Sequence, residues 1–436
     1  MPVLNSFQPD IEKRSPDEIK SYQERLLRDQ INYTVRNSPY YKRLFREKKI
    51  APDKIKTLED LRKIPFTTKD TLNRHNQDFI CVDKSKIVDY ITTSGTLGDP
   101  VTFVMTENDL ERLAYNEAIS FACSGCSSHD IMQLTTTMDK RFMAGLAYFM
   151  GARKLGAGIV RVGAGIPELQ WDSIERVQPT TLIAVPSFIL KLIEYAEKNN
   201  IDYQHSSILK AICIGEPLRK QDFSLSTLAE RITEKWNIRL FSTYASTEMS
   251  TAFAECEYGK GGHHHPELII TEFIDEEGNP VREGEAGEVT ITTLGVEGMP
   301  LIRFRTGDIC HHYISPCECG RTTMRLGPVV GRRKQMIKFK GTTVYPPALY
   351  DILDGIREIH NYVVEVYTND IGTDEILIKA GCLQLSDDLE KVIKDHFRAK
   401  LRVSPSISFL DIDEVEKLKF PENSRKPVIF QDKRLA

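Results

Sequence analysis

The segment from residue 87 to residue 245 constrains the fold most, because strand-like and helical patterns alternate along it. The expected strands are Ile87–Thr93, Ile131–Thr135, Gly158–Val162, Thr181–Val185 and Ala211–Ile214. The expected helices are Asp109–Cys123, Met143–Leu155, Trp171–Arg176, Ser187–Lys198 and Asp222–Trp236. Short apolar strands alternating with longer helices predict an α/β fold in which a mainly parallel sheet is covered by helices.

The regions on either side of this segment have different patterns. Ser15–Glu18 supplies a capping residue, a proline and two acids in order, which predicts a helix beginning at Pro16. Strand-like runs dominate from Glu267 to Ile309, which predicts a β-rich subdomain. The remaining C-terminal part reads as a compact α+β unit. We therefore expect a large N-terminal domain over residues 1–331 and a small, mobile C-terminal domain over residues 332–436.

Composition excludes several classes of protein. The formal net charge is −4, with Lys+Arg 58 against Asp+Glu 62, so no basic surface for nucleic acid is expected. No apolar run approaches the ~20 residues of a membrane helix, and Met1–Asn5 does not begin a signal peptide. The odd number of cysteines, 9, favours a reducing compartment over a secreted disulfide framework. These features predict a cytoplasmic enzyme without nucleic-acid or membrane partners.

The stretch Thr92–Pro100, which reads TTSGTLGDP, is rich in glycine and hydroxyl residues. Its glycines allow a ligand to approach the backbone closely, and its hydroxyl groups can donate to phosphate oxygens. It lacks the Gly-Lys-Ser/Thr ending of a P-loop, so that assignment fails. By itself the stretch also fits an ordinary turn after a strand.

Four further stretches follow it in order: Ile214–Pro217, Tyr244–Glu248, Arg303–Asp308, and Gly331–Lys338 ahead of Gly341. Their order and spacing resemble the adenylate-forming superfamily of acyl-CoA synthetases. Within it, the chain is most similar to phenylacetate–CoA ligases and the related coenzyme F390 synthetase-like proteins. The resemblance extends from about residue 5 to Arg434. It implies an enzyme that activates a carboxylic acid with ATP and then transfers the acyl group.

The resemblance also implies a nucleotide site. Such a site must bind a polyphosphate, hold adenosine and neutralise charge at the α-phosphate. The implied nucleotide-binding residues are Ser94, Gly95, Thr96, Gly98, Gly215, Glu216, Pro217, Tyr244, Ala245 and Ser246. Thr247 is implied to contact the α-phosphate, and Glu248 to hold Mg²⁺ as an oxygen ligand. Asp308 would accept hydrogen bonds from the ribose hydroxyls, with Arg332 supporting the ribose or the phosphate.

Three more roles are implied near the C-terminus. Lys426 aligns with the lysine that contacts the carboxylate and the α-phosphate, where a compact ammonium suits the developing charge. By itself, Lys426 also fits a basic residue on a solvated tail. Lys334 is at the position of the hinge about which the small domain rotates before the second half-reaction. Gly341 would then face the thioester site.

The sequence departs from the family pattern in two places. In the phosphate loop, Asp99 replaces the usual lysine and Leu97 replaces the second threonine. Before and after Lys426, Arg425 and Ile429 replace the usual glycine and arginine. A carboxylate beside a polyphosphate weakens its contacts or makes them more dependent on Mg²⁺, so a catalytically weak nucleotide-binding homologue is an alternative.

A second constellation is formed by Cys256, His263, Cys317 and Cys319. Two thiolates from a Cys-x-Cys turn, together with a Cys/His pair, match a closed tetrahedral Zn²⁺ site of structural type. Some phenylacetate–CoA ligase-like proteins carry Cys and His at these places. His263 aligns better than His264 or His265, which could substitute for it. The alternative is a set of free cysteines in a reducing cell.

The leading hypothesis is an ATP-dependent ligase that joins an aryl acid, such as phenylacetate, to coenzyme A. The segment Asp139–Gly151, with Phe142, Ala144 and Tyr148, lines part of the acid pocket or is ordinary helix core. One alternative keeps adenylation but changes the acceptor, as in an F390 synthetase-like or carrier-protein-loading enzyme. A homodimer is expected by resemblance only.

Overall fold

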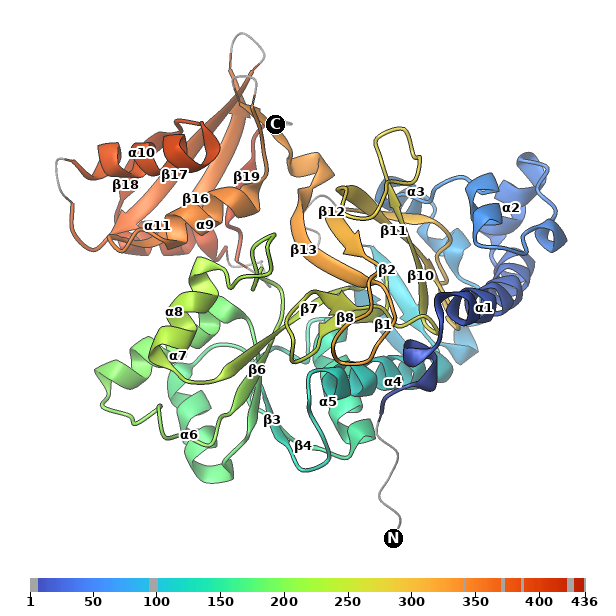
Figure 1. Cartoon of the computed structure of the whole chain (residues 1–436), viewed down its shortest axis with the longest axis horizontal. Helices are drawn as coiled ribbons and strands as arrows, with labels where there is room; N and C mark the ends of the chain where they lie inside the picture. The colour runs from blue at the N-terminus through green and yellow to red at the C-terminus, as the bar shows by residue number, and fades with distance from the viewer. Residues whose placement is uncertain are drawn as a thin grey trace. The chain divides into compact units, whose positions relative to one another are not determined.

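The computed structural model describes residues 7–93, 101–339, 342–369, 373–385, 388–421 and 427–434. The chain forms two compact units (Figure 1). The first comprises Met1–Ser224, Arg231–Thr306 and Cys310–Pro328; the second comprises Leu225–Glu230, Gly307–Ile309 and Val329–Ala436. The predicted division into an N-terminal domain of residues 1–331 and a mobile C-terminal domain of residues 332–436 stays a prediction.

An eleven-stranded sheet runs through the larger part of the chain in the order β10-β11-β12-β13-β9-β8-β7-β6-β5-β3-β4. Its strands are β3 (Ile131–Leu134), β4 (Gly158–Arg161), β5 (Thr181–Ala184), β6 (Lys210–Cys213), β7 (Arg239–Ser246), β8 (Thr251–Glu255), β9 (Gly262–His263), β10 (Ile269–Ile274), β11 (Gly287–Thr293), β12 (Phe304–Tyr313) and β13 (Arg325–Arg332). The separate pair β1 (Asp89–Thr92) and β2 (Thr102–Met105) is antiparallel.

The helices of the N-terminal region are α1 (Pro16–Asn37), α2 (Pro39–Glu47), α3 (Lys69–Arg74), α4 (Glu107–Cys123), α5 (Met143–Leu155), α6 (Pro167–Val177) and α7 (Pro186–Lys198). Helix α8 (Thr227–Lys235) follows β6. A short 3-10 helix, Asp10–Lys13, precedes α1.

Strands β4, β3, β5, β6 and β7 form the parallel part of the sheet. Met132 and Leu134 of β3 belong to the apolar cluster that α4 and α5 bury. The intervening Gln133 points to the other face, where its Nε2 donates to the Gln170 carbonyl of α6 at 3.1 Å. Because successive residues of a strand face opposite ways, these contacts show that helices cover both faces, as the sequence predicts.

The remaining strands extend the same sheet in antiparallel fashion. Strand β7 pairs antiparallel with β8, β8 with β9, and β9 with β13. The β10–β11 pair is antiparallel as well. The strand-rich region therefore continues the parallel sheet instead of forming a sheet of its own, a pairing between distant segments that local patterns do not specify.

Element boundaries follow capping chemistry. The Ser15 side chain and Glu18 form a capping box at the start of α1, as predicted. Helix α5 ends at Gly156, which adopts φ +85°. The helix expected from Asp222 begins later, at Thr227, because the Asp222 carboxylate accepts the Ser224 N–H at 2.9 Å in a turn. The short helix expected over 171–176 is longer, since Pro167 provides its first turn.

The C-terminal unit has its own sheet and core. Its strands are β16 (Ile359–Thr368), β17 (Asp374–Cys382), β18 (Ser406–Leu410) and β19 (Phe430–Asp432), in the order β18-β17-β16-β19. Its helices are α9 (Pro346–Asp354), α10 (Leu389–Leu401) and α11 (Ile412–Lys419), and β14 (Ile337–Phe339) pairs with β15 (Thr342–Val344). This is the compact α+β arrangement expected from the sequence.

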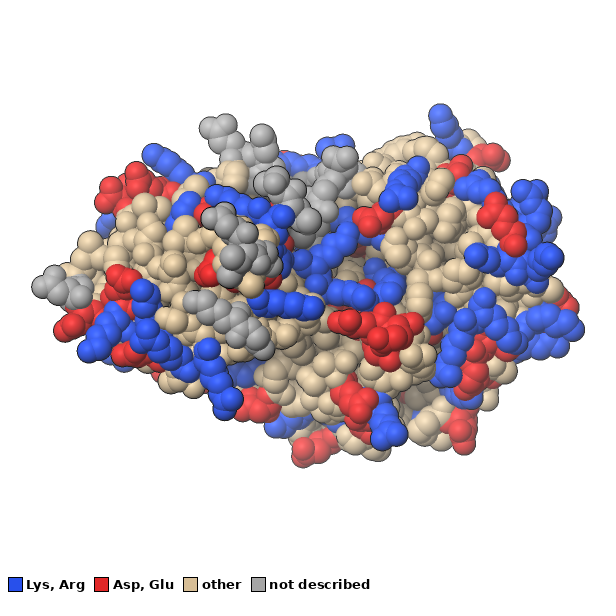
Figure 2. Space-filling view, turned by 90° about the horizontal axis from the view of Figure 1, so that it is seen from above, with Lys and Arg blue, Asp and Glu red and all other residues tan. Residues whose placement is uncertain are grey.

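Charge is mixed over the visible surface. Figure 2 shows Lys and Arg interspersed with Asp and Glu, in keeping with the formal net charge of −4. Among the described residues, no helix is both long and apolar enough to cross a membrane.

Candidate nucleotide site and metal centre

The turn after β6 exposes backbone at the carboxyl end of a parallel strand. Gly215 adopts φ +76°, and a Cβ built there would meet no atom of the described residues within 4 Å, which leaves room for a ligand to approach this backbone. The Glu216 side chain does not point into that opening. Its two oxygens accept from the backbone N–H and the hydroxyl of Ser187, both at 2.8 Å, and so cap the start of α7. Glu216 thus anchors the turn that Gly215 and the exposed Pro217 present.

The turn that joins β7 to β8 carries the next predicted set. Tyr244 is half-buried in β7 with its ring 6.0 Å from that of Phe253, and Ala245 is exposed. The Ser246 hydroxyl accepts from the Met249 N–H at 3.3 Å, which holds the turn. The Thr247 hydroxyl and the Glu248 carboxylate have no hydrogen-bond partner within the described part of the chain. These oxygens suit a hard cation or a phosphate group, so Mg²⁺ fits Glu248 chemically.

Asp308 of β12 and Arg332 of β13 form a direct ion pair. Arg332 Nε donates to Asp308 Oδ1 at 3.0 Å. The Asp308 side chain is 11% exposed and that of Arg332 is 43% exposed. The structure therefore brings these two predicted ribose-site residues together.

The predicted hinge residue Lys334 is exposed in the 3-10 helix Arg333–Gln335. The Arg434 guanidinium donates to the carbonyl oxygens of Lys334 at 3.3 Å and Met336 at 2.7 Å. It also donates to the Asp374 carboxylate at 2.9 Å. The C-terminal tail thereby fastens the segment just after the predicted hinge to the C-terminal unit.

Several predicted residues lie outside the described part of the chain. They are Ser94, Gly95, Thr96 and Gly98 of the phosphate loop, the departures Leu97 and Asp99, the thioester-side Gly341, and Lys426 with Arg425. Their implied roles remain predictions.

The three residues assigned to the acid pocket differ in burial. Phe142 and Ala144 are half-buried at the start of α5, and Ala144 packs against the α4–α5 core. Tyr148 is a member of that core, with its ring 6.2 Å from the ring of Phe121. Burial, together with the nearby Glu117 carboxylate, raises the pKa of Tyr148. Tyr148 therefore has a core packing role, and the pocket role of all three stays a prediction.

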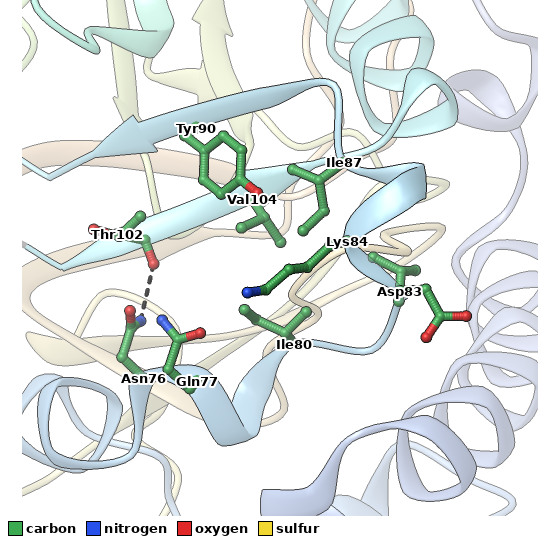
Figure 3. Close-up of a pocket in the computed structure, with 10 residues that line it drawn as sticks. Asn76, Gln77, Ile80, Asp83, Lys84, Ile87, Tyr90, Thr102 and Val104 are labelled. Atoms are coloured by element: carbon green, nitrogen blue, oxygen red, sulfur yellow. Dashed lines mark hydrogen bonds between the residues drawn. The ribbon is translucent and has the colours of Figure 1, made fainter.

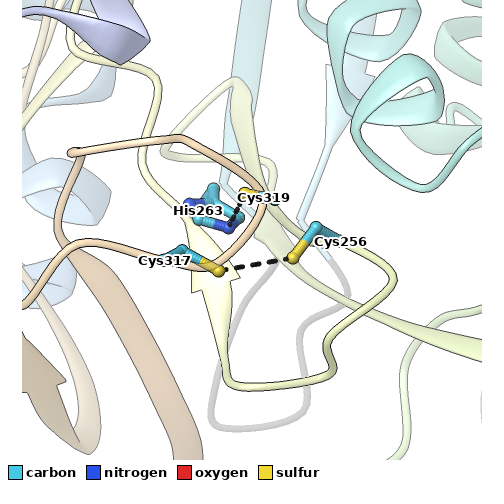
Figure 4. Close-up of side chains that lie close together, drawn as sticks. All are labelled: Cys256, His263, Cys317 and Cys319. Atoms are coloured by element: carbon cyan, nitrogen blue, oxygen red, sulfur yellow. Dashed lines mark hydrogen bonds between the residues drawn. The ribbon is translucent and has the colours of Figure 1, made fainter.

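Four side chains form a compact cluster beyond the end of β8 (Figure 4). The ligand atoms of Cys256, His263, Cys317 and Cys319 all lie within 4.8 Å of one another. The sulfurs of Cys256 and Cys317 lie 3.7 Å apart, and Cys319 Sγ lies 3.4 Å from His263 Nε2. Three thiols and one imidazole in this arrangement fit a tetrahedral zinc ion with no ligand position left open.

The strand register selects His263 among the three consecutive histidines. Strand β9 ends at His263 and pairs it with Ala254 of β8 and Arg325 of β13. His264 Nε2 instead lies 2.6 Å from the carbonyl oxygen of Ile269, and His265 Nδ1 lies 2.6 Å from Glu12 Oε1. His263 Nδ1 is 3.3 Å from the Thr323 hydroxyl, so its Nε2 is the nitrogen left to face the cysteines.

Charged residues support the cluster from behind. Arg321 donates to Glu12 Oε2 at 2.6 Å and to Cys319 Sγ at 3.6 Å. Burial alone would raise the pKa of Glu12, but the charges and hydrogen bonds of His265 and Arg321 outweigh it and hold that pKa below its usual value. The pKa of Cys319 is also lowered, first by the neighbouring Cys256 thiol and then by His263 and Arg321. A thiol that ionises easily is a better metal ligand.

Sequence reasoning missed Glu12, Thr323 and the pair Arg219–Glu255, all of which contact predicted site residues or their neighbours. Glu255 directly precedes Cys256, and Arg219 follows Pro217 by two positions. Their closeness in the sequence to predicted site residues could have identified Glu255 and Arg219 as candidates. Glu12 and Thr323 gave no such signal, because their contacts join segments far apart in the chain.

A hollow of about 320 Å³ lies beside the β1–β2 pair (Figure 3). Ile80, Ile87, Tyr90 and Val104 form apolar walls around the Lys84 side chain. Asn76 donates to the Thr102 carbonyl at 2.9 Å along its rim. Of the predicted site residues that the structure describes, none lines this hollow.

Comparison with known proteins gives a consistent result. The family model described as AMP-binding enzyme matches residues 29–298. A phenylacetate-coenzyme A ligase of Escherichia coli is 30% identical over 357 residues, covering 80% of this chain and 78% of that protein. Its namesake from Thermus thermophilus is 29% identical over 378 residues, covering 86% of this chain and 83% of that protein.

Solved structures share the fold. A 2-hydroxyisobutyryl-CoA ligase in the postadenylation state, in complex with R3-HIB-AMP, has a TM-score of 0.85 at 21% identity, covering 100% of this chain and 94% of that chain. The same ligase with 2-HIB-AMP and CoA, in the thioesterification state, has a TM-score of 0.71 at 22% identity, covering 99% of this chain and 94% of that chain.

Proposed function

The chain belongs to the family of AMP-binding enzymes, and on that premise we propose that it is a phenylacetate–CoA ligase-like enzyme acting on an aryl acid. It joins a carboxylic acid to coenzyme A through an acyl-adenylate, releasing pyrophosphate in the first step and AMP in the second. The observation that carries this proposal is likeness over most of the chain to bacterial phenylacetate-coenzyme A ligases.

In adenylation, a carboxylate oxygen of the acid attacks the α-phosphorus of ATP and pyrophosphate leaves. We assign Thr247 to the α-phosphate, because no residue that the structure describes takes up its hydroxyl group. Lys426 neutralises charge on the carboxylate and the α-phosphate, and Ser94, Gly95, Thr96 and Gly98 bind the departing pyrophosphate. Mg²⁺ held by Glu248 would supply further charge neutralisation on the phosphates when bound.

The adenosine is held by the two open turns. Gly215 and Pro217 present backbone to the adenine, and Tyr244 offers a ring face for stacking. Ala245 and Ser246 shape the floor beside it. Asp308 accepts from the ribose hydroxyls while its ion pair with Arg332 fixes its orientation. Phe142, Ala144 and Tyr148 are assigned to the acid side.

We assign the second half-reaction to rotation of the domain 332–436 about Lys334, which would bring Gly341 to the thioester site. The thiol of coenzyme A attacks the acyl carbon of the adenylate, and AMP leaves.

A homodimer is expected by resemblance, and light scattering of the purified protein tests it.

We further propose that Cys256, His263, Cys317 and Cys319 hold a structural zinc ion. Three of the four ligands are buried, Cys319 is partly exposed, and the set of four is complete, so the ion would stabilise the fold and leave no ligand position for water or substrate. Metal analysis of protein purified without chelator tests this assignment: about one zinc per chain is expected, and metal-free, folded protein contradicts it.

The proposed reaction is tested by ATP–pyrophosphate exchange with a panel of carboxylic acids, followed by CoA-dependent AMP release. Exchange with phenylacetate or another aryl acid, and AMP release that needs CoA, are expected. Exchange without CoA-dependent turnover would instead identify another acceptor. Absence of exchange with every acid would favour a nucleotide-binding homologue.

Two variants separate the half-reactions. Lys426→Ala is expected to abolish exchange while sparing thioester formation from supplied acyl-adenylate. Lys334→Pro is expected to show the reverse, because proline restricts the backbone change that a hinge must absorb. Equal loss of both half-reactions in each variant would refute this division of labour.

A further inference from the structure

The metal cluster and the open turn after β6 share a buried carboxylate that neither site uses directly. Glu255, the last residue of β8, is 1% exposed and immediately precedes the ligand Cys256. Its Oε2 accepts the backbone N–H of Ser242 in β7 at 3.0 Å, and its Oε1 accepts from Arg219 Nε at 2.5 Å. Both oxygens are therefore engaged, one with the neighbouring strand and the other with the Arg219 guanidinium.

Arg219 lies just beyond that turn, two positions after Pro217. Its side chain is 15% exposed, and its Nη1 donates to the Phe223 carbonyl at 3.1 Å. Glu216 anchors the same turn on its other side, through Ser187 of α7. The exposed Gly215 backbone is thus held between two carboxylate-based anchors.

The segment between the metal ligands Cys256 and His263 packs directly on the Arg219 guanidinium. Gly259, in that segment, adopts φ +61°, and a Cβ there would overlap the Nη2 atom of Arg219. The Gly259 N–H donates to the Cys256 carbonyl at 3.1 Å, so the turn begins at the metal ligand itself. The position of the guanidinium therefore depends on how the segment 256–263 is folded.

We propose that Arg219 and Glu255 are positioning residues that couple the metal cluster to the nucleotide turn. A metal bound by Cys256 and His263 holds the segment between them in one conformation. That segment and Glu255 hold the Arg219 guanidinium in place. Arg219 in turn holds the turn that presents Gly215 to the nucleotide. Metal occupancy then sets the affinity for the nucleotide without the metal touching it. This inference rests on the proposed nucleotide role of the Gly215–Pro217 turn.

The chemistry of the pair explains why the coupling is strong. Glu255 is buried, so removal of its cation leaves an uncompensated carboxylate and is costly. Arg219 uses Nε and Nη1 at fixed angles to two acceptors, which a lysine ammonium cannot reproduce. Arg219→Lys therefore keeps the charge while releasing the geometry, and is the variant of choice.

The buried pair Glu12–Arg321 provides a matched control. It also flanks the metal cluster, since Arg321 donates to Cys319 Sγ, but it contacts the N-terminal segment and not the turn after β6. Arg321→Lys makes the same chemical change at an equally buried carboxylate.

The test is direct binding of AMP by calorimetry to zinc-loaded wild type, Arg219→Lys and Arg321→Lys, with zinc content measured for each. Arg219→Lys is expected to retain zinc and to weaken AMP binding about tenfold, while Arg321→Lys stays within about twofold of the wild type. In the exchange assay, Arg219→Lys raises KM for ATP and leaves kcat nearly unchanged. Removal of zinc from the wild type weakens AMP binding to a similar extent, and removal from Arg219→Lys adds nothing further.

Each other outcome has a distinct meaning. Unchanged AMP affinity in zinc-loaded Arg219→Lys, or equal weakening by the two variants, overturns the coupling through Arg219. Full AMP affinity in folded, zinc-free wild type overturns the role of the metal. Failure of the zinc-loaded wild type to bind AMP overturns the proposed nucleotide site itself, and the coupling with it.

Discussion

The two ends of the β7–β8 pair differ in how their polar groups are satisfied. Beyond the end of β8, Cys256 meets the other metal-ligand side chains in a cluster that is buried except at Cys319 and whose members contact one another. At the turn that joins the strands, Thr247 and Glu248 are half-buried, and their side-chain oxygens lack hydrogen-bond partners within the described residues. Polar groups that contact one another, as at the metal cluster, stabilise a fold, and we call this the closed end of the hairpin. Polar side chains without partners, as at the turn, can bind a ligand, and we call this the open end. Opposite ends of one hairpin thus serve stability and binding.

The largest expected effect comes from breaking the closed end. Cys256→Ala is expected to abolish zinc binding and to lower the free energy of unfolding by about 4 kcal/mol, because a structural metal contributes its binding energy to folding. Metal analysis and calorimetric melting measure the two effects. The control is Cys123→Ala, which removes a sulfur packed against the cluster but bonded to the Ala254 carbonyl at 3.4 Å. That variant should keep its zinc; loss of zinc from it would mean that the ligand set is misassigned.

Glu117 is a buried carboxylate without a cation beside it in the described part of the chain. Glu117 of α4 is 5% exposed, and Asn116, a neutral amide, is its hydrogen-bond partner at 3.0 Å. No cation pairs with it among the described side chains, unlike Glu12, which is held by Arg321 and His265. Burial therefore raises the pKa of Glu117 from 4.5 to about 7. The unfolded chain loses this proton near pH 4.5 and the folded chain only near pH 7, so stability falls across that window and is constant above it.

Glu117→Gln removes this titration. As pH rises, the free energy of unfolding of the variant is expected to increase relative to that of the wild type. The increase reaches about 3 kcal/mol at pH 8. Melting curves at pH 5 and pH 8 measure the difference. Glu12→Gln is the matched control and should destabilise at pH 8, because it leaves Arg321 without its carboxylate. A constant difference between Glu117→Gln and the wild type at both pH values would contradict the burial argument.

Elements with local sequence signals could be predicted from the sequence, whereas contacts that depend on the pairing of distant strands could not. Helix α5 begins and ends where its pattern predicts, since a 3.6-residue periodicity and Gly156 are local signals. The four metal ligands were predicted from spacing and resemblance, and they do cluster. The choice of His263 over His265 was not decidable from residues alone, because the register of β9 between β8 and β13 determines it. Such pairing joins distant segments and has no local signal.

The smallest expected effect sharpens the description of the open end. Tyr244→Ala is expected to weaken AMP binding about tenfold, the usual contribution of one base stacked on an aromatic ring. Tyr244→Phe keeps the ring and should remain within about twofold of the wild type. Because Tyr244 is only half-buried, zinc content and melting temperature should be nearly unchanged in both variants. Calorimetric titration with AMP measures the affinities. Equal weakening by Phe and Ala would show that the phenol and not the ring contacts the nucleotide, and a large loss of stability would place Tyr244 with the closed end of the hairpin.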